Sequence, residues 1–169
     1  MKAAFFSCLL FGMLACRSSG EAATSIDAAP APSASPPMNV ASAVPAPADV
    51  VALRNGLLEL EAHVRWRSVS GAWPAKRAKW LSDVNTSTTS AAMGARVLEL
   101  ESAMGWSAIQ PTWRDRRPDW MKDIARARTN AAIADALMEL ETAIKWSALD
   151  DQWPSLRSAW LASLHAIKS

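Results

Sequence analysis

The sequence predicts an all-α domain of three tandem 40-residue helix-turn-helix repeats, six helices in all, forming either a short α-solenoid or a compact helical bundle. The segments that start at Leu57, Val97 and Leu137 superimpose without a gap at a period of 40 residues. All nine tryptophans fall into three columns of that period. Tandem helix pairs of this length stack so that each covers its neighbour's apolar face. The three columns are Trp66, Trp106 and Trp146, then Trp73, Trp113 and Trp153, and then Trp80, Trp120 and Trp160.

The N-terminus has the organisation of a secretion signal. A basic start, Met1-Lys2, is followed by the 13-residue apolar run AAFFSCLLFGMLA and then by the polar stretch that opens at Cys16. This run is shorter than the roughly 20 apolar residues that cross a bilayer as a helix. We therefore expect residues 1–15 to be a cleaved signal peptide and the mature chain to have no transmembrane helix.

The residues Met13-Leu14-Ala15-Cys16 resemble the signal motif of bacterial lipoproteins, with Met13 where that class usually has Leu. The resemblance implies that Cys16 receives a diacylglycerol thioether, that the signal is cut before it, and that the new N-terminus is acylated with a fatty acid such as palmitate. Several acyl chains anchor a protein stably. Arg17 stands where an Asp would retain the protein at the inner membrane, which favours the outer membrane. The alternative is an ordinary signal cut after Ala15 that leaves a free thiol.

A linker follows the cysteine. Residues 16–49 hold six of the ten prolines, no aromatic residue and few charges, so they cannot bury enough apolar surface to fold. Such a chain spans about 30 Å as a coil and on the order of 100 Å when stretched. We expect a disordered Ala/Pro/Ser tether between the membrane and the domain.

Residues 50–169 form the predicted domain, with repeats at 50–90, 91–130 and 131–169. In each repeat a first helix carries apolar residues at the 4-3-4 spacing of one helix face. A polar turn follows, and a second helix opens with Trp-Pro in repeats one and three, where proline suits a first helical turn. Pro118 in repeat two should make its second helix start late or kink. The apolar stripes are Leu53, Leu57, Leu60 and Val64; Met93, Val97, Leu100 and Met104; and Ile133, Leu137, Leu140 and Ile144.

A glutamate of the first helix and an arginine of the second helix recur unchanged in every repeat. At 100° per residue, Arg77 falls inside the apolar face of its helix, where an unpaired charge is costly. Glu61, at the edge of the first helix's stripe, is the candidate partner. We expect each guanidinium also to stack on a neighbouring indole. The expected pairs are Arg77 with Glu61, Arg117 with Glu101, and Arg157 with Glu141.

The tryptophans have two possible roles. Most recur where helix-pair core residues belong, and tryptophan supplies a large area to a small core. A ladder of platforms for sugars or peptides is the alternative. Trp66, Trp106 and Trp146 are the exceptions to the core role, because they lie opposite the leucine stripe; they either fill the joint between repeats or bind a partner.

Charge and composition exclude several functions. The formal net charge is +2, without the basic stripe of nucleic-acid binders, so nucleic acid is not an expected partner. The two cysteines, Cys8 and Cys16, precede the domain, and His63 and His165 stand outside any metal-ligand cluster. No nucleophile–base pair, phosphate-cradling glycine loop or triad-like set can be assembled. We expect no enzyme, no metal and no cofactor beyond the lipid on Cys16.

These features predict a lipid-anchored protein of the bacterial cell envelope, at the outer rather than the inner membrane, whose helical repeats bind another envelope protein. A glycan- or peptidoglycan-binding module with exposed tryptophans is the first alternative. A structural or inhibitory lipoprotein is the second. The exposure of the indoles distinguishes the binding hypotheses, because a ladder of platforms needs solvent-facing rings.

Overall fold

The structure is a computed structural model that describes residues 47–167. The predicted signal, Cys16 and most of the predicted tether lie outside these residues. The described part is all-helical, as the repeat pattern predicts, and two isolated backbone bridges are its only β-type pairings. The helices are α1 (Ala48–His63), α2 (Trp66–Val69), α3 (Trp73–Thr86), α4 (Ser90–Ala103), η1 (Trp106–Ala108), α5 (Trp113–Arg126), α6 (Asn130–Ala143), η2 (Trp146–Ala148) and α7 (Trp153–His165).

The first helices of the three repeats, α1, α4 and α6, form the centre of the domain. Each of them packs against the other two. Their apolar stripes meet there: Leu53, Leu57, Leu60 and their equivalents in the other repeats are completely buried. A buried aliphatic side chain of this size contributes about 1.5–3 kcal/mol, so this triangle of helices is the main apolar core.

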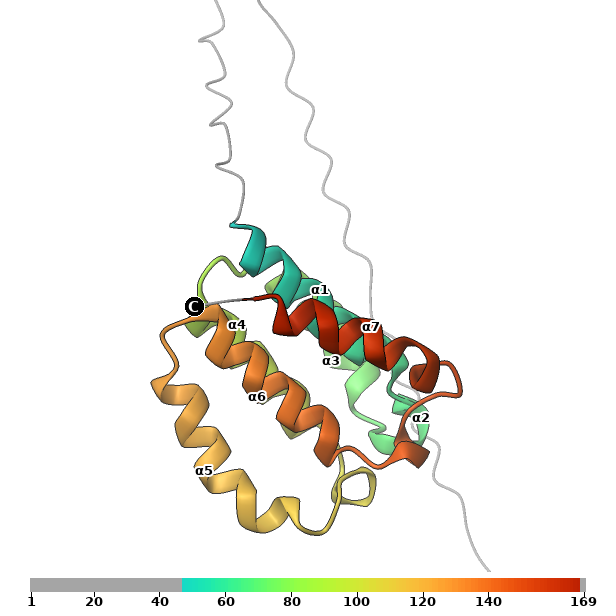
Figure 1. Ribbon diagram of the computed structural model, residues 1–169. Coiled ribbons are helices and arrows are strands. Elements are labelled where there is room, and N and C mark those ends of the chain that lie inside the picture. The colour runs from blue at the N-terminus through green and yellow to red at the C-terminus, as the bar shows by residue number, and fades with distance from the viewer. Residues whose placement is uncertain (1–46, 168–169) are drawn as a thin grey trace, which may run out of the picture. The chain divides into compact units, whose positions relative to one another are not determined.

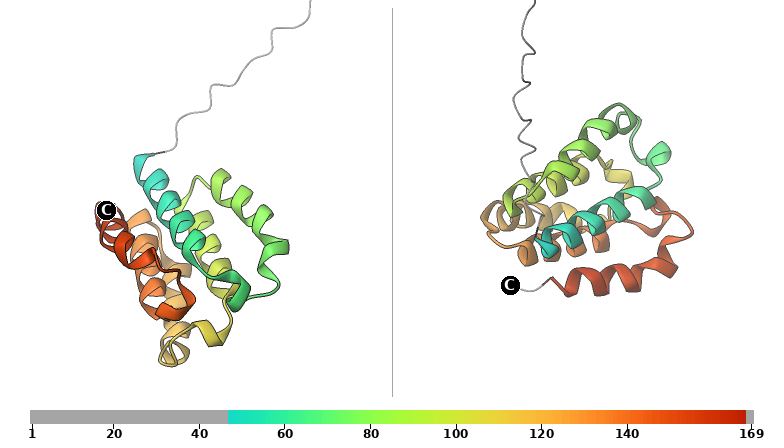
Figure 2. Two further views of the ribbon diagram at one scale, coloured as in Figure 1. Left: turned by 90° about the vertical axis from the view of Figure 1, so that its right-hand side faces the viewer. Right: turned by 90° about the horizontal axis from the view of Figure 1, so that it is seen from above.

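The second helices, α3, α5 and α7, surround this centre. Helix α3 packs on α1 and α4, α5 packs on α4 and α6, and α7 packs on α6 and on α1. Figures 1 and 2 show α7, the last helix, lying alongside α1, the first. Of the two arrangements that the repeat pattern allows, the structure is therefore the compact bundle, closed into a ring with pseudo-threefold symmetry.

The third tryptophan column links each repeat to the next. Nε1 of Trp80 donates to the carbonyl oxygen of Arg96, 16 residues later, at 3.1 Å. Trp120 makes the same step to Ala136 at 2.9 Å. Trp160 donates to Gly56 at 2.7 Å, which is the same step carried from the third repeat back to the first. The tryptophan of the third column thus makes the same hydrogen bond at each of the three joints of the ring.

Local sequence explains where the helices begin. Thr89 and Thr129 are the N-caps of α4 and α6, and each side chain accepts a hydrogen bond from a backbone N–H three residues on. Proline follows the first tryptophan of α3 and α7. Of the two outcomes expected for Pro118, a late start of α5 is wrong: this helix begins at Trp113, in register with its equivalents, and contains Pro118. The burial of Trp113 and Trp120 on the neighbouring helices holds the first turn in place.

We call the three joints of the ring seams: the first seam lies between α3 and α4, the second between α5 and α6, and the third between α7 and α1. Backbone hydrogen bonds cross two of them. In the second seam, Gln110 N donates to Ala143 O and Lys145 N to Ala108 O, both at 2.8 Å; in the third seam, Asp150 N donates to His63 O and Arg65 N to Ala148 O, both at 2.9 Å. Within residues 47–167, no equivalent backbone pair crosses the first seam.

The first seam differs because its turn is wound differently. The segment after Trp66 is a short α-helix in which Ser70 N bonds back to Trp66 O, whereas the equivalent turns are 3-10 helices. The second repeat has Gly105 where the others have Arg65 and Lys145. A Cβ at Gly105 would lie 3.0 Å from the carbonyl oxygen of Val69, so the close approach of this turn requires a small residue.

Candidate functional site

Each repeat contains a cluster in which a buried glutamate is bonded to a buried tryptophan and to a partly exposed arginine. In the first repeat, Arg77 donates to Glu61 through Nε (2.7 Å) and Nη2 (2.9 Å). The indole of Trp73 donates to the same carboxylate at 2.8 Å. Glu61 is only 1% exposed, so a charge that would be costly alone is fully paired. The same three bonds join Glu101 to Trp113 and Arg117, and Glu141 to Trp153 and Arg157.

The clusters are structural ion pairs. The hydrogen bond to Glu61 raises the pKa of Arg77 above its ordinary value, although partial burial acts in the opposite direction. Glu101 and Glu141 raise the pKa values of Arg117 and Arg157 in the same way. Each carboxylate is occupied by a bidentate guanidinium and an indole N–H. The structure thus brings together all three predicted pairs and tightly holds the first helix of each repeat to the second.

The first tryptophan column lies at the end of the ring opposite the start of α1, which we call the far end. The turns after α1, α4 and α6 meet there: α2 contacts η2, and a backbone bridge joins Ile109 to Ile144. Trp106 is 52% and Trp146 56% exposed, far more than the other large apolar residues that reach the surface. Six of the nine indoles are core residues, but these two face solvent.

Arginines hold the two exposed indoles. The guanidinium carbons of Arg114 and Arg117 lie 5.5 and 6.0 Å from the ring centre of Trp106, and that of Arg157 lies 5.9 Å from the ring of Trp146. Cation–π stacking of this kind orients the ring without covering it. The stacking that we expected for the paired arginines is therefore present in repeats two and three.

Trp66 behaves differently from its equivalents. Its ring stacks on Trp73 of its own repeat at 4.6 Å with an interplanar angle of 25°, and its Nε1 donates to Glu61 O. It is half-buried. Trp66 therefore packs within its own repeat. No tryptophan of this first column makes the inter-repeat hydrogen bond that the third column makes.

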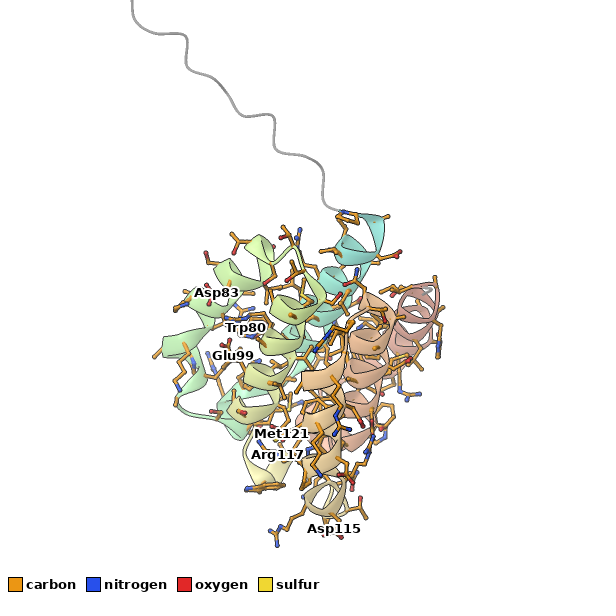
Figure 3. The ribbon with its side chains drawn as sticks, turned by 90° about the vertical axis from the view of Figure 1, so that its left-hand side faces the viewer. Trp80, Asp83, Glu99, Asp115, Arg117 and Met121 are labelled. Carbon is orange, nitrogen blue, oxygen red and sulfur yellow. The ribbon has the colours of Figure 1, made fainter. Side chains whose placement is uncertain are left out.

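A groove of about 590 Å³ opens on the first seam. Trp73, Trp80, Leu98 and Ala103 contribute to its lining, and the lining is mostly apolar. In Figure 3, Trp80, Asp83 and Glu99 lie together at this groove. The charged residues on its rim are Lys76, Lys79, Asp83 and Glu99.

One arginine holds both acidic residues of the groove. Nη1 of Arg96 lies 2.7 Å from Asp83 and 2.9 Å from Glu99. Asp83 also pairs with Lys79. The hydrogen bond from Lys79 lowers the pKa of Asp83, although partial burial acts in the opposite direction. Both carboxylates are therefore held in ion pairs with Arg96 or Lys79, an arrangement that does not suit proton transfer.

Sequence reasoning missed the role of several side chains. The indole bonds of the second and third tryptophan columns need tertiary contacts that no spacing shows. The contacts of His63 were also not predicted: its Nδ1 lies 2.9 Å from Asp150 across the third seam, and its ring lies beside Trp153. The sequence did contain one signal for His63: the equivalent position is alanine in the other two repeats, Ala103 and Ala143.

Two further properties concern the described residues alone. Between residues 47 and 167, no group of three or more His, Cys, Asp or Glu side chains is arranged to hold a metal ion. No helix in the described part of the chain is long and apolar enough to cross a membrane. Cys16, the predicted lipidation site, lies outside this part.

Comparison with known proteins gives one partial match. Residues 92–149 match a family model described as a domain of unknown function (DUF8799). The matched segment runs from α4 to the turn before α7 and so contains both exposed indoles, Trp106 and Trp146. No curated protein and no solved structure matches the chain. The chain is thus similar, over about one and a half repeats, to a family whose function is not known.

Proposed function

We propose that this protein is a lipid-anchored cell-envelope protein that uses the far end of its helical ring to dock another envelope protein. The observation that carries the proposal is the exposure of Trp106 and Trp146 at one end of a ring whose other tryptophans are mostly buried. Tryptophan and arginine are the residues that most often dominate protein interfaces. Exposed indoles held by Arg114, Arg117 and Arg157 supply both types on one surface.

The position of these residues suits a tethered protein. The chain enters the domain at Ala48, at the opposite end of α1 from the tryptophan turns. A lipid on Cys16 and a tether of some thirty residues would leave the far end free to meet a partner. The anchor rests on the sequence motif Met13-Leu14-Ala15-Cys16.

The test compares two matched double variants of the lipidated chain. Trp106→Ala with Trp146→Ala removes the exposed indoles, whereas Val51→Ala with Met121→Ala removes the other two large exposed apolar residues, one in the first turn of α1 and one in the middle of α5. Both chains are captured from detergent-solubilised envelope after cross-linking. We expect a specific co-purifying envelope protein that the tryptophan variant loses and the control retains.

Cell-wall sacculi serve as the second arm of this experiment. Co-sedimentation of the unmodified chain with sacculi, lost in the tryptophan variant, would replace the protein partner by a glycan. A co-purifying protein that both variants retain equally would overturn the far end as the docking surface. Metabolic labelling with a palmitate analogue, with Cys16→Ser as the control, tests the anchor separately.

A further inference from the structure

The groove of the first seam is unusual because the equivalent positions of the other two seams are filled. In the second seam, Arg116 crosses from α5 and bonds to Glu139, with Nη2 to Oε2 at 3.0 Å, and to Asp123. Glu139 and Asp123 are the equivalents of Glu99 and Asp83. The first seam has Lys76 in place of Arg116, and Lys76 makes no such bridge.

The third seam is filled by a different pair. His63 stands at the position of Ala103, lies beside Trp153 and bonds to Asp150. Leu156 stands at the position of Lys76 and is partly buried, whereas Lys76 is exposed. At these two positions the first seam has Ala103, which is small, and Lys76, which forms no ion pair with the opposite helix, and the groove lies there.

We propose that this groove binds a short peptide segment of a partner protein in which aliphatic side chains are flanked by acidic residues. The aliphatic side chains would lie against Trp73, Trp80, Leu98 and Ala103, and a carboxylate would pair with Lys76. The proposal does not depend on the docking role of the far end, because the groove and the exposed indoles share no residue.

The charges of the rim select an acidic ligand. Asp83 and Glu99 are already neutralised by Arg96, and Lys79 is paired with Asp83. Lys76 is exposed, and no carboxylate within residues 47–167 lies within ion-pair distance of it. A carboxylate of the ligand would give Lys76 the partner that Arg116 has in the second seam, whereas a basic ligand would meet an uncompensated cation.

The size and shape of the groove select a peptide. Its volume of about 590 Å³ falls within the range of about 300–1,000 Å³ of ligand pockets. The lining of α3 runs from Trp73 to Asp83, about 15 Å along a helix, which equals some four to five residues of extended chain. The groove is open at the surface along two adjacent helices, so a chain can continue beyond it.

The probes are three peptides: Ac-Gly-Glu-Leu-Leu-Glu-Gly-amide and its analogues with Lys or Gln in place of both Glu residues. The protein is the secreted chain from residue 16 onward with Cys16→Ser, labelled with nitrogen-15, and the readout is the indole N–H signals. We expect the Glu peptide to shift the signals of Trp73 and Trp80 saturably. The equivalent indoles of the other seams, those of Trp113 and Trp153, are internal controls that should not move. We expect the Lys peptide to bind about tenfold more weakly.

Variants of Lys76 separate binding from folding. Lys76→Arg introduces the filling residue of the second seam beside Asp83 and Glu99, so the chain should remain folded while the Glu peptide loses about tenfold in affinity. Ser70→Asp with Ala103→His introduces the filling pair of the third seam and should have the same effect. Lys76→Glu should reverse the preference between the Glu and Lys peptides. Lys122→Arg, an exposed substitution on α5, is the matched control.

Any of three results would overturn the proposal. The first is the absence of shifts at Trp73 and Trp80 with the Glu peptide. The second is equal binding of the Glu and Lys peptides. The third is unchanged binding in both filled variants. Sodium decanoate is run in parallel, and binding of decanoate without binding of the Glu peptide would reassign the groove to an amphiphilic carboxylate.

Discussion

The third and first seams of the ring join equivalent helices but are built differently. The third seam, where the end of the domain meets its beginning, has two crossing backbone hydrogen bonds and the His63–Asp150 pair. A Cβ at Gly56 would lie 2.7 Å from a methyl carbon of Leu164, so the helices approach very closely there. The first seam lacks crossing backbone bonds and contains the groove instead.

The difference shows which residues build the ring and which adapt it. The paired glutamates and arginines and the second and third tryptophan columns are identical in all three repeats: the first three groups make the same bonds within every repeat, and the third tryptophan column makes the same bond at every seam. The positions that vary, such as Lys76 against Leu156 and Ala103 against His63, decide whether a seam is filled. Stability is thus a property of the repeat, and the groove lies where the repetition is broken.

Removal of a whole repeat should have the largest effect. Deleting residues 130–169 removes the second and third seams together and exposes the apolar stripes of α1 and α4. We expect the truncated chain to lose its cooperative urea transition, monitored by circular dichroism, because a closed ring cannot lose a member and remain covered. Deletion of residues 17–46 is the control and should leave the transition unchanged. A cooperative transition in the truncated chain would indicate an open stack.

Breaking one of the glutamate–tryptophan–arginine clusters should have the next largest effect on stability. The loss should be the same in the first repeat as in the third. Glu61→Gln and Glu141→Gln each leave an arginine and an indole around a neutral group, and each should lower the free energy of unfolding by about 3 kcal/mol. The half-buried Glu59→Gln is the matched control and should cost little. Equilibrium urea unfolding measures all three, and a cost below that of the control at either cluster would contradict its role.

The third seam should also respond to pH through Asp150. Burial opposes ionisation, but the hydrogen bonds from His63 and from the backbone N–H groups of Gln152 and Trp153 prevail and lower the pKa of Asp150 below its ordinary 3.8. A depressed pKa in the folded state contributes stability above the unfolded value, and this stability is lost as the pH falls through the folded value.

Asp150→Asn should therefore destabilise the protein by about 1 kcal/mol at pH 7, since it weakens the bond to His63 and the bonds that Asp150 accepts from the backbone N–H groups of Gln152 and Trp153. Below about pH 3.8, the difference between the variant and the parent should shrink. Urea unfolding at pH 7 and pH 3 measures it. The exposed Asp151→Asn is the control, and a difference that grows towards low pH would show that the sign is wrong.

The smallest effect is expected at the first seam. Lys76→Arg should raise the urea midpoint slightly, because it adds a surface ion pair of the type that Arg116 forms, and such pairs contribute little. Arg116→Lys should lower the midpoint slightly for the same reason. A marked loss of stability in Lys76→Arg would mean that the first seam cannot accept the packing of the second.

Much of the fold was predictable because the repetition makes each inference three times. The period, the leucine stripes and the pairing of Glu61 with Arg77 follow from helix geometry and from the cost of a bare buried charge. The exposure of Trp106 and Trp146 also follows from their position opposite the stripe. The late start that Pro118 suggested for α5 was wrong, because local propensity gave way to the burial of Trp113 and Trp120.

Closure of the ring and the groove were not predictable from spacing. An open stack and a closed ring use the same helix faces. They differ in whether Trp160 bonds to the carbonyl oxygen of Gly56, a contact between distant segments that helix spacing does not predict. The groove depends on how far Lys76 reaches and on the winding of the turn after Trp66. Both are tertiary properties that leave no periodic trace in the sequence.

The most direct test of ring closure is a circular permutant. The new chain would start at Ser90, run to Ala166, continue through a Ser-Thr-Thr loop like the one between α3 and α4, and end with residues 50–86. In a closed ring this connection restores the repeat, so the permutant should unfold cooperatively within about 1 kcal/mol of the parent and keep the near-ultraviolet circular dichroism of its buried indoles. Loss of the cooperative transition or of that indole signal would contradict closure.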